Sequence, residues 1–359
     1  MRLLADEVER QKQAEALAED LISHALSFYS VNVAAVQPVV QAPAETADSW
    51  LVFTHEGVFR LYLQDATENT STVLQVWQHL VNQGFSRLAP LLPASHGDVC
   101  VSLGGRLAYL AKEVDGRPCE LAVQADAVEV GRCLGELHIL SRDLLFSLQN
   151  ALEHSRAAEP SLAVQREDLE LFRTMAEHRL YPTGFDRLLI KIFGEAIRFA
   201  DQCLEFLAQL SLDGIENSPC CSGLLLEDYR GRNFKVDVHG TVRLSLIRKV
   251  TWGPCIKDLA GVLDLIGERT DWDVAAASRV LDAYQDVRAL QPGEQELMYA
   301  LGTFPSRVWQ VCCEYYKGRR NRSEPEAAEM LCREWENQIK RREYWQLLLG
   351  DVLGYENST

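Results

Sequence analysis

A carboxylate and an amide at fixed spacing give the sequence its first chemical signal. In the stretch LLLEDYRGRNFKVDVHG, Asp228 and Asn233 stand five residues apart after an apolar run, and a second apolar run follows around Gly240. Phosphoryl-transfer sites hold a catalytic Asp and a metal-binding Asn at this spacing, with another acidic metal ligand on the following strand. That strand reads RLSLIRKV here and contains no acid. The stretch therefore indicates either phosphoryl transfer or its loss.

The elements that would position these residues change in type along the chain. A helix is expected over residues 4–30, then strands with one further helix, and mostly helices beyond residue 116. A single β insertion over residues 224–248 interrupts the helical part. This order is α+β and resembles the layout of the bilobal protein-kinase-like fold. Its N-terminal helix and small β-rich N-lobe would occupy residues 1–115, and its larger helical C-lobe residues 116–359.

Hydrophobic periodicity and turn residues give the individual elements. Strands are expected over residues 31–40, 50–54, 58–63, 99–103 and 106–114. Helices are expected over residues 71–83, 122–150, 164–180, 186–212, 257–267, 273–288, 292–302, 305–317 and 324–350.

Composition limits the function classes. The chain has 359 residues and a net charge of −16, so nucleic acid is not an expected partner, because its phosphates would be repelled. No run of eighteen apolar residues occurs and the charged N-terminus does not resemble a signal peptide, so we expect neither a membrane span nor secretion. The basic cluster KGRRNR at 317–322 is expected to cap a helix rather than bind an anion. Ten scattered cysteines without CxxC spacing predict reduced, mostly buried thiols, although cross-linking stays open.

Several ordered segments resemble one superfamily. The segment WGPCIKDLA, 252–260, resembles the GPxxxDLA segment of the aminoglycoside-phosphotransferase-like kinases, and the Asp228 to Asn233 stretch precedes it at the separation that the superfamily uses. The segment AYLAKEVDGR, 108–117, is similar to the strand and ExxxGR turn of its hinge. The resemblance covers residues 30–345, and it implies a two-lobed kinase-like fold.

The C-terminal part resembles a narrower group. TFPSRVW, 303–309, followed by YYK, 315–317, is similar to the FPxxxW…YY ending of the CotS-type spore coat proteins. Glu227-Asp228-Tyr229 stands where that group often has Gln-Asp-Tyr. This resemblance implies a role in the coat of bacterial endospores, with other coat or sporulation proteins as partners. An acidic body with a basic patch and exposed aromatic residues in this C-terminal segment would suit such partners.

The resemblance also fixes where a kinase would hold its nucleotide. The phosphate-binding lysine falls on Tyr62, and a phenol carries no positive charge near neutral pH. Arg60 should share the face of Tyr62, but a guanidinium two positions earlier would not reproduce the reach of the lysine. The glutamate that orients the lysine falls on Gln78. Glu113 and Val114 would line the degenerate cleft at the hinge, where Glu113 is expected to be solvated.

The metal ligands are also missing under this alignment. Leu246 occupies the position of the metal-binding acid, and Arg248 that of the second acid. Leucine offers Mg²⁺ no oxygen, and Arg248 would place a cation there. The segment VNVAAVQPVVQAPAETADSW contains no glycine that would let amides fold over phosphates. Asp228 and Asn233 remain, either as catalytic residues or as turn residues that bond the backbone.

Other polar residues give weaker signals. Ser95-His96-Gly97-Asp98 contains the His-Gly-Asp of active relatives, but it precedes the hinge and is expected to form a loop turn. His138 lies on an apolar helix and is expected to be packed or surface-exposed, not a ligand.

These observations favour a catalytically impaired pseudokinase that acts as a structural or interaction component in spore coat assembly. No cofactor is expected, and the protein would be in the mother-cell cytoplasm or deposited in the coat. The alternative is a hydroxyl-directed phosphotransferase that uses ATP and Mg²⁺ with Asp228, Asn233 and an unconventional cation, Arg60 or Arg248. A third possibility is a module that binds a nucleotide or anion without turnover.

Overall fold

The computed structural model describes residues 19–39, 48–142, 144, 161–209, 220–226, 234–247, 249–318 and 322–350. Within them the chain forms two compact units. The first unit contains the described residues up to Cys119 and the later segment Arg232–Val250 as far as it is described, and the second unit contains the rest.

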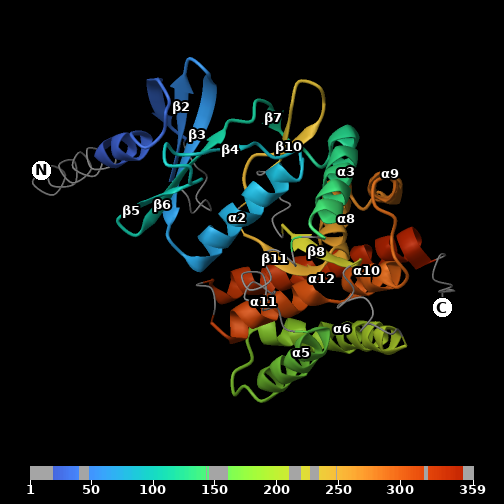
Figure 1. Ribbon diagram of the computed structural model, residues 1–359. Coiled ribbons are helices and arrows are strands. Elements are labelled where there is room, and N and C mark those ends of the chain that lie inside the picture. Colours follow the sequence, from blue (N-terminus) through green and yellow to red (C-terminus); the bar gives the residue numbers. More distant parts are fainter. Residues whose placement is uncertain are drawn as a thin grey trace, which may run out of the picture. The chain divides into compact units, whose positions relative to one another are not determined.

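The first unit is built on an antiparallel sheet with the strand order β1-β2-β3-β6-β4, in which β5 also pairs with β6 (Figure 1). Its strands are β1 (Val33–Pro38), β2 (Asp48–Thr54), β3 (Gly57–Asp65), β4 (Leu91–Leu92), β5 (Val101–Leu103) and β6 (Arg106–Lys112).

Successive side chains of β3 and β6 point to opposite faces of this sheet, and both faces are buried. Leu61, Leu63 and Ala108 lie in one apolar cluster with Ile22 and Leu26 of the helical segment 19–26. The opposite face carries Tyr62 and Tyr109, which are directly paired across the strands. Helix α2 (Glu68–Asn82) covers this face through Trp77, whose ring meets Tyr109 edge-on at 6.2 Å. Side chains of a strand point alternately to its two faces, so these two sets separate as expected.

A second, three-stranded sheet belongs to the same unit. Strands β9 (Phe234–Val236) and β10 (Val242–Leu244) pair antiparallel, and β7 (Arg117–Pro118) extends β9. The turn between β9 and β10 contains Gly240 at φ 80° and is held by Asp237, whose carboxylate accepts from the Thr241 amide at 3.0 Å. The glycine turn expected from the sequence is therefore confirmed.

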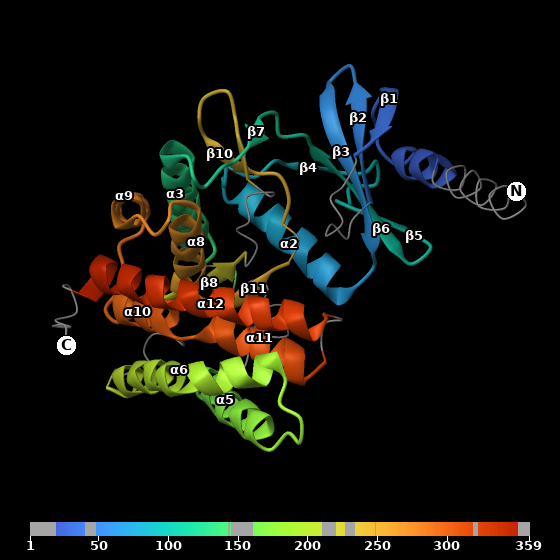
Figure 2. The same ribbon diagram turned by 180° about the vertical axis from the view of Figure 1, so that it is seen from behind.

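The second unit is mainly helical, with one two-stranded ribbon of β8 (Ser222–Leu225) and β11 (Thr251–Pro254). Its helices are α3 (Gln124–Leu140), α5 (Leu162–Glu177), α6 (Gly184–Ala208), α8 (Ile256–Arg269), α9 (Val274–Gln285), α10 (Glu294–Thr303), α11 (Ser306–Tyr316) and α12 (Glu324–Trp345). In this unit α5 and α6 lie side by side as an outer pair against α11 and α12 (Figures 1 and 2).

Caps and buried polar contacts fix the helix ends. Ser323 and Glu326 form a capping box at the start of α12, where the Ser323 amide donates to the Glu326 carboxylate at 2.9 Å. The other end of α12 is tied inward, because Arg341 pairs with Asp264 of α8 and the Trp345 indole donates to the same carboxylate at 2.7 Å. Charge-assisted bonds of this kind are the stronger ones in a protein interior.

Most of the predicted helices and strands are observed, with ends that differ by a few residues, and strands β4, β7 and β11 were not predicted. Helix α3 ends at Leu140 and a turn follows at Ser141 and Arg142, so the prediction of one helix over 122–150 is wrong at these two residues. Most of residues 143–150 lie outside the described residues. The helix predicted over 324–350 changes at Gln346 into a five-residue π-helical turn. All ten cysteines are free thiols and most are buried, which confirms that expectation. Among the described helices, none is both long and apolar enough to cross a membrane.

Candidate functional site

At the position expected to hold the phosphate-binding lysine, the first unit has a packed aromatic pair. Tyr62 is 3% exposed and stacks on Tyr109, with ring centroids 5.0 Å apart and planes inclined by 19°. Stacked rings of this kind stabilise the sheet by packing against each other, and they offer no positive charge to a phosphate. Tyr62 thus fills a core position.

The same tyrosine reaches the segment expected to hold the metal. Its hydroxyl donates to the backbone carbonyl of Ser245 at 3.1 Å. The next residue, Leu246, is 6% exposed, and Ile247 is buried beside it. In an active site of this class a lysine and an acid at these positions would face phosphate and Mg²⁺. Here Tyr62 instead bonds to the backbone of Ser245, the residue before Leu246, within one unit.

Gln78 does not take part in this contact. It lies on α2 next to the buried Trp77, and its side-chain amide donates to Asn82 one turn later, at 3.2 Å. The two residues at the expected lysine and glutamate positions, Tyr62 and Gln78, therefore make their hydrogen bonds to different neighbours. No pair resembling the lysine–glutamate ion pair forms at these two positions.

Glu113 at the hinge is the centre of an ion-pair cluster, which corrects the expectation that it is solvated. The guanidinium of Arg60 binds its carboxylate through two bonds, of 2.7 and 3.0 Å, and Lys235 Nζ approaches it at 2.5 Å. The Glu113 side chain is 14% exposed. Burial works to raise the pKa of Glu113, but the bonds from Arg60 and Lys235 outweigh it and lower the pKa below its usual value.

The same cluster engages Arg60, the residue considered as a substitute for the lysine. As expected, its residue lies on the same strand face as Tyr62, but its planar fork is occupied by Glu113 in the bidentate geometry that guanidinium groups prefer. Lys235 was not singled out from the sequence. A basic residue two positions after Asn233, at the start of a strand, was the only signal that could have suggested it.

The hinge is drawn close to β9. The carbonyl of Val114 accepts from Lys235 Nζ at 2.9 Å. Gly116 follows with φ 154°, and a Cβ added there would overlap the carbonyl of Val236. Only glycine permits both that conformation and that approach. The glycine of the hinge turn is therefore required by packing against β9.

In the second unit, one buried acid anchors the start of the candidate catalytic loop. Asp258, the acid of the DLA segment, is fully buried on α8 and accepts the Leu226 amide at 2.8 Å. The predicted residues Asp228 and Asn233 follow Leu226 and lie outside the described residues, as does Arg248. The loop thus starts from a fixed backbone position.

A chain of buried polar groups stands behind Asp258. His138 Nε2 lies 3.6 Å from its carboxylate, and His138 Nδ1 lies 2.8 Å from the hydroxyl of Tyr284. Arg288 donates to that hydroxyl at 3.1 Å and forms a two-bond ion pair with Glu294. Arginine can only donate, so the Tyr284 hydroxyl accepts from Arg288 and donates its own proton to His138 Nδ1. The imidazole proton is then on Nε2, which faces Asp258. His138 is fully buried, which is the packed one of the two placements expected for it.

The His-Gly-Asp of residues 96–98 forms a turn, as expected. The Gly97 amide donates to the Ala94 carbonyl at 2.8 Å, and Gly97 has φ 97°. Among the described residues, no group of three or more His, Cys, Asp or Glu side chains is arranged to hold a metal ion.

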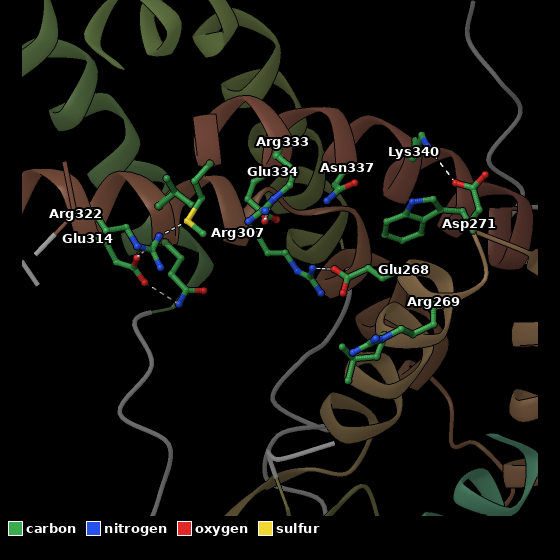
Figure 3. Close-up of a pocket in the computed structure, with 15 residues that line it drawn as sticks. Glu268, Arg269, Asp271, Arg307, Glu314, Arg322, Arg333, Glu334, Asn337 and Lys340 are labelled. Atoms are coloured by element: carbon green, nitrogen blue, oxygen red, sulfur yellow. Dashed lines mark hydrogen bonds and ion pairs between the residues drawn. The ribbon is translucent and has the colours of Figure 1, made fainter. Parts of the chain in front are cut away.

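A polar hollow of about 760 Å³ lies between α8, α11 and α12 of the second unit (Figure 3). Its acids are held by neighbouring cations: Glu268 by Arg307, and Asp271 by Lys340 at 3.1 Å. Glu314 contacts Arg322 in the same way. The hollow contains none of the predicted site residues.

The aromatic residues of the FPxxxW…YY segment are packed, so the expectation that they are exposed for partners is wrong. Phe304 is fully buried, and the Trp309 indole donates to Asp168 at 2.9 Å. Tyr315 stacks on Phe185 with centroids 4.0 Å apart. The Tyr316 hydroxyl donates to Asp186 at 2.7 Å. These residues join α11 to α5 and α6.

Comparison with known proteins places the fold. No protein-family model and no curated protein matches the sequence. An aminoglycoside phosphotransferase from Alicyclobacillus acidocaldarius matches with a TM-score of 0.74 and 19% identity, over 92% of this chain and 96% of that one. A spectinomycin phosphotransferase solved with ADP and spectinomycin matches with a TM-score of 0.62 and 12% identity, over 90% and 98%.

A microcompartment-associated aminopropanol kinase matches less closely, with a TM-score of 0.52 and 14% identity over 91% of this chain and 97% of that one. At such identities the likeness concerns the fold. The chain has the α+β, kinase-like fold of the aminoglycoside phosphotransferases, with a small antiparallel-sheet region and a larger helical one, as the sequence predicted.

Proposed function

We propose that this protein is a pseudokinase: a kinase-like chain with impaired catalysis that acts as a structural or interaction component. The observation that carries the proposal is the hydrogen bond from Tyr62 to the Ser245 carbonyl, beside the buried Leu246. A phenol and a leucine replace the cation and the acid that neutralise triphosphate and metal. Arg60 is engaged by Glu113 and does not compensate.

Loss of these groups together weighs heavily on the rate. Removal of one electrostatic element costs on the order of 10²–10³ in rate. Such losses are not additive when residues act as a unit. The phosphate-binding lysine and the metal-binding acid, however, act on different charges, those of the triphosphate and of the metal ion. We therefore expect neither ATP nor Mg²⁺ to be a cofactor.

The retained anchor explains why the fold persists without its chemistry. Asp258 and the buried groups behind it stabilise the second unit through contacts that need no nucleotide. We propose spore coat assembly as the setting, with other coat or sporulation proteins as partners. The support for this finer proposal is the likeness of residues 303–317 to the CotS-type ending.

The decisive test is calorimetric titration of the full chain with ATP, with and without Mg²⁺, beside thermal unfolding. We expect no Mg²⁺-dependent heat and no upshift in Tm. A clear Mg²⁺-dependent upshift with ATP that Asp228→Ala abolishes would overturn the proposal. The coat assignment is tested separately, by whether the protein is recovered in purified spores.

One observation favours the alternative of a hydroxyl-directed phosphotransferase. Leu226, two residues before Asp228, is fixed by Asp258, as a working catalytic loop would require. In that case Asp228 would accept the substrate proton and Asn233 would hold Mg²⁺, with Arg248 as the remaining unconventional cation. Transfer of the ATP γ-phosphate to any hydroxylated small molecule, lost in Asp228→Asn, would favour this alternative.

A further inference from the structure

The polar hollow between α8, α11 and α12 has more cations than acids in its lining. Five arginine or lysine side chains line it against four carboxylates, in a chain whose net charge is −16. Its volume of about 760 Å³ lies within the range of pockets that hold small molecules. Three of the four acids are paired with three of the cations. The charged groups left over are Arg269, Arg333 and Glu334.

Arg269 is a cation without a partner. It is the last residue of α8, its side chain is exposed, and it makes no hydrogen bond or ion pair within the part of the chain that the structure describes. The end of a helix favours a positive charge, which accounts for a basic residue here but not for its place in the lining of a hollow. A planar guanidinium binds phosphate and carboxylate groups through two parallel bonds. Arg269 can therefore bind an anionic group in the hollow.

Glu334 is an acid whose hydrogen-bonding capacity is not used. Figure 3 shows Glu334 on α12 and Arg269 on α8, on either side of the pair formed by Glu268 and Arg307. The Glu334 side chain is 15% exposed, and its enclosed Oε2 has no hydrogen-bond partner among the described residues. Its Oε1 lies 3.7 Å from Arg333 Nε, which is too far for a hydrogen bond. An ionised carboxylate only accepts, so Glu334 needs a donor from outside these contacts.

Two further residues give the hollow an apolar wall and a neutral polar group. Trp272 follows Asp271 in a turn where both have positive φ, 66° and 49°, and a Cβ on Gly267 would overlap the indole. The turn thus folds the indole back onto α8, where it presents apolar surface to the hollow. Asn337 of α12 adds an amide that can donate and accept.

Together these groups define the chemistry of a ligand. Arg269 requires an anionic group, and Glu334 requires a hydrogen-bond donor. An ammonium donor would meet the excess of positive charge in the lining, so a hydroxyl group is favoured. The indole of Trp272 suits a ligand with C–H surface between its polar groups. Sugar phosphates, sugar acids and hydroxy acids combine these properties.

We propose that the hollow binds a hydroxylated organic anion, whose phosphate or carboxylate pairs with Arg269 and whose hydroxyl donates to Glu334. The site stands apart from the candidate catalytic loop. Asp258, which anchors that loop, is eleven residues before Arg269 on α8, or about 16 Å along the helix axis. Binding here needs no phosphoryl transfer, so the proposal is independent of the pseudokinase assignment.

Calorimetric titration of the full chain with glucose 6-phosphate, glucuronate and citrate gives the first test, with neutral glucose as the control ligand. We expect at least one of the three anions to bind with a dissociation constant of about 1 mM or below. Glucose should bind about tenfold more weakly than that anion, or not at all, because it offers nothing to Arg269. No binding by any of the three up to about 10 mM would overturn the proposal, as would glucose binding equally well.

The variant Arg269→Gln tests the anionic contact. It should raise the dissociation constant of the bound anion by about tenfold or more, because it removes a charge-assisted bond. The matched control is Arg187→Gln, which removes an exposed arginine of α6 that does not line the hollow. The control should bind as the wild type does. Equal weakening by both variants, or no weakening by Arg269→Gln, would contradict the proposed site.

The variant Glu334→Leu separates the hydroxyl contact from a purely structural role. It should weaken the same anion by about fivefold or more, because the hydroxyl loses its acceptor. Without ligand the Tm should stay unchanged or rise, because Oε2 gives up no hydrogen bond and the pair with the exposed Arg333 is weak. A fall in this Tm would show that Glu334 already stabilises the unit, and unchanged affinity would remove the hydroxyl contact. Either result contradicts the proposal.

Discussion

The hydroxyl of Tyr62 and the carbonyl of Ser245, 183 residues apart in sequence, meet at 3.1 Å in the first unit. The contact joins Tyr62, at the position expected for the phosphate-binding lysine, to the residue before Leu246, at the position expected for the metal-binding acid. A neutral hydrogen bond there is a stabilising feature of the unit itself, and its strength can be measured.

Removing the Tyr62 hydroxyl should cost stability without any gain of binding. Tyr62→Phe keeps the stack on Tyr109 and loses the bond to Ser245, so the free energy of unfolding should fall by about 0.5–1.5 kcal/mol. Tyr62→Lys would place a cation in a buried aromatic setting and should cost about 3 kcal/mol. Urea unfolding measures both. A Lys variant as stable as the wild type, with Mg²⁺-dependent ATP binding, would mean that the position is still a phosphate site.

The Asp258 carboxylate should control the backbone just before Asp228. Asp258→Ala leaves the buried Leu226 amide without its acceptor and removes the carboxylate 3.6 Å from His138 Nε2, so we expect a loss of about 1–3 kcal/mol. Amide exchange at Leu226 should accelerate more than at Leu224, whose amide is held by Ser141 at 3.1 Å. Equal acceleration at both amides would indicate a general loss of stability rather than loss of an anchor.

Asp186 should make the second unit sensitive to acid. Burial works to raise its pKa, but hydrogen bonds from the Thr183 backbone, Tyr316, the Thr183 hydroxyl and Arg179 outweigh it and lower the pKa. A carboxyl with a lowered pKa in the folded state contributes stability above its unfolded value of about 3.9, and loses it as the pH falls through the folded pKa. Thermal unfolding from pH 7 to below pH 3 should show this loss. Asp186→Asn should be less stable at neutral pH, with a flatter acid limb.

Thiol reactivity should follow burial. Burial raises the pKa of Cys255 to about 12, and it also raises the pKa of the fully enclosed Cys312. The thiolate is the reactive form, so both should resist iodoacetamide until the protein unfolds. Cys220 and Cys332 are exposed and should be modified first. Mass spectrometry of a native time course checks the order, and early labelling of Cys255 would contradict it.

Two helical glycines should respond oppositely to alanine. A Cβ on Gly302 of α10 would overlap the indole of Trp345, whereas a Cβ on Gly194 of α6 meets no atom within 4 Å. Gly302→Ala should therefore destabilise the protein by about 1–3 kcal/mol through overpacking. Gly194→Ala should stabilise it by about 0.5–1 kcal/mol, because alanine favours the helix interior. Chemical unfolding of both variants tests the pair, and a neutral Gly302→Ala would show that Trp345 can move aside.

The sequence predicted the fold class and most elements, because these depend on local patterns. The alternation of β3 and the glycine turn at Gly240 are both readable within a few residues. The substitutions at Tyr62 and Leu246 were also visible as residue types.

The sequence could not show which distant residues each of these side chains contacts. Glu113 looked solvated because its two cations come from distant strands, and Lys235 is 122 residues away. The tail aromatics looked available to partners, because the stacking of Tyr315 on Phe185 is a property of three packed helices. Contacts between distant residues follow from the folded arrangement, and no local pattern encodes them.

The bond between Tyr62 and Ser245 has a consequence for the cell. Both groups belong to the polypeptide, so this bond forms within the folded first unit itself. If the proposed function holds, we expect the protein to keep the same form whether the adenylate pool is full or exhausted.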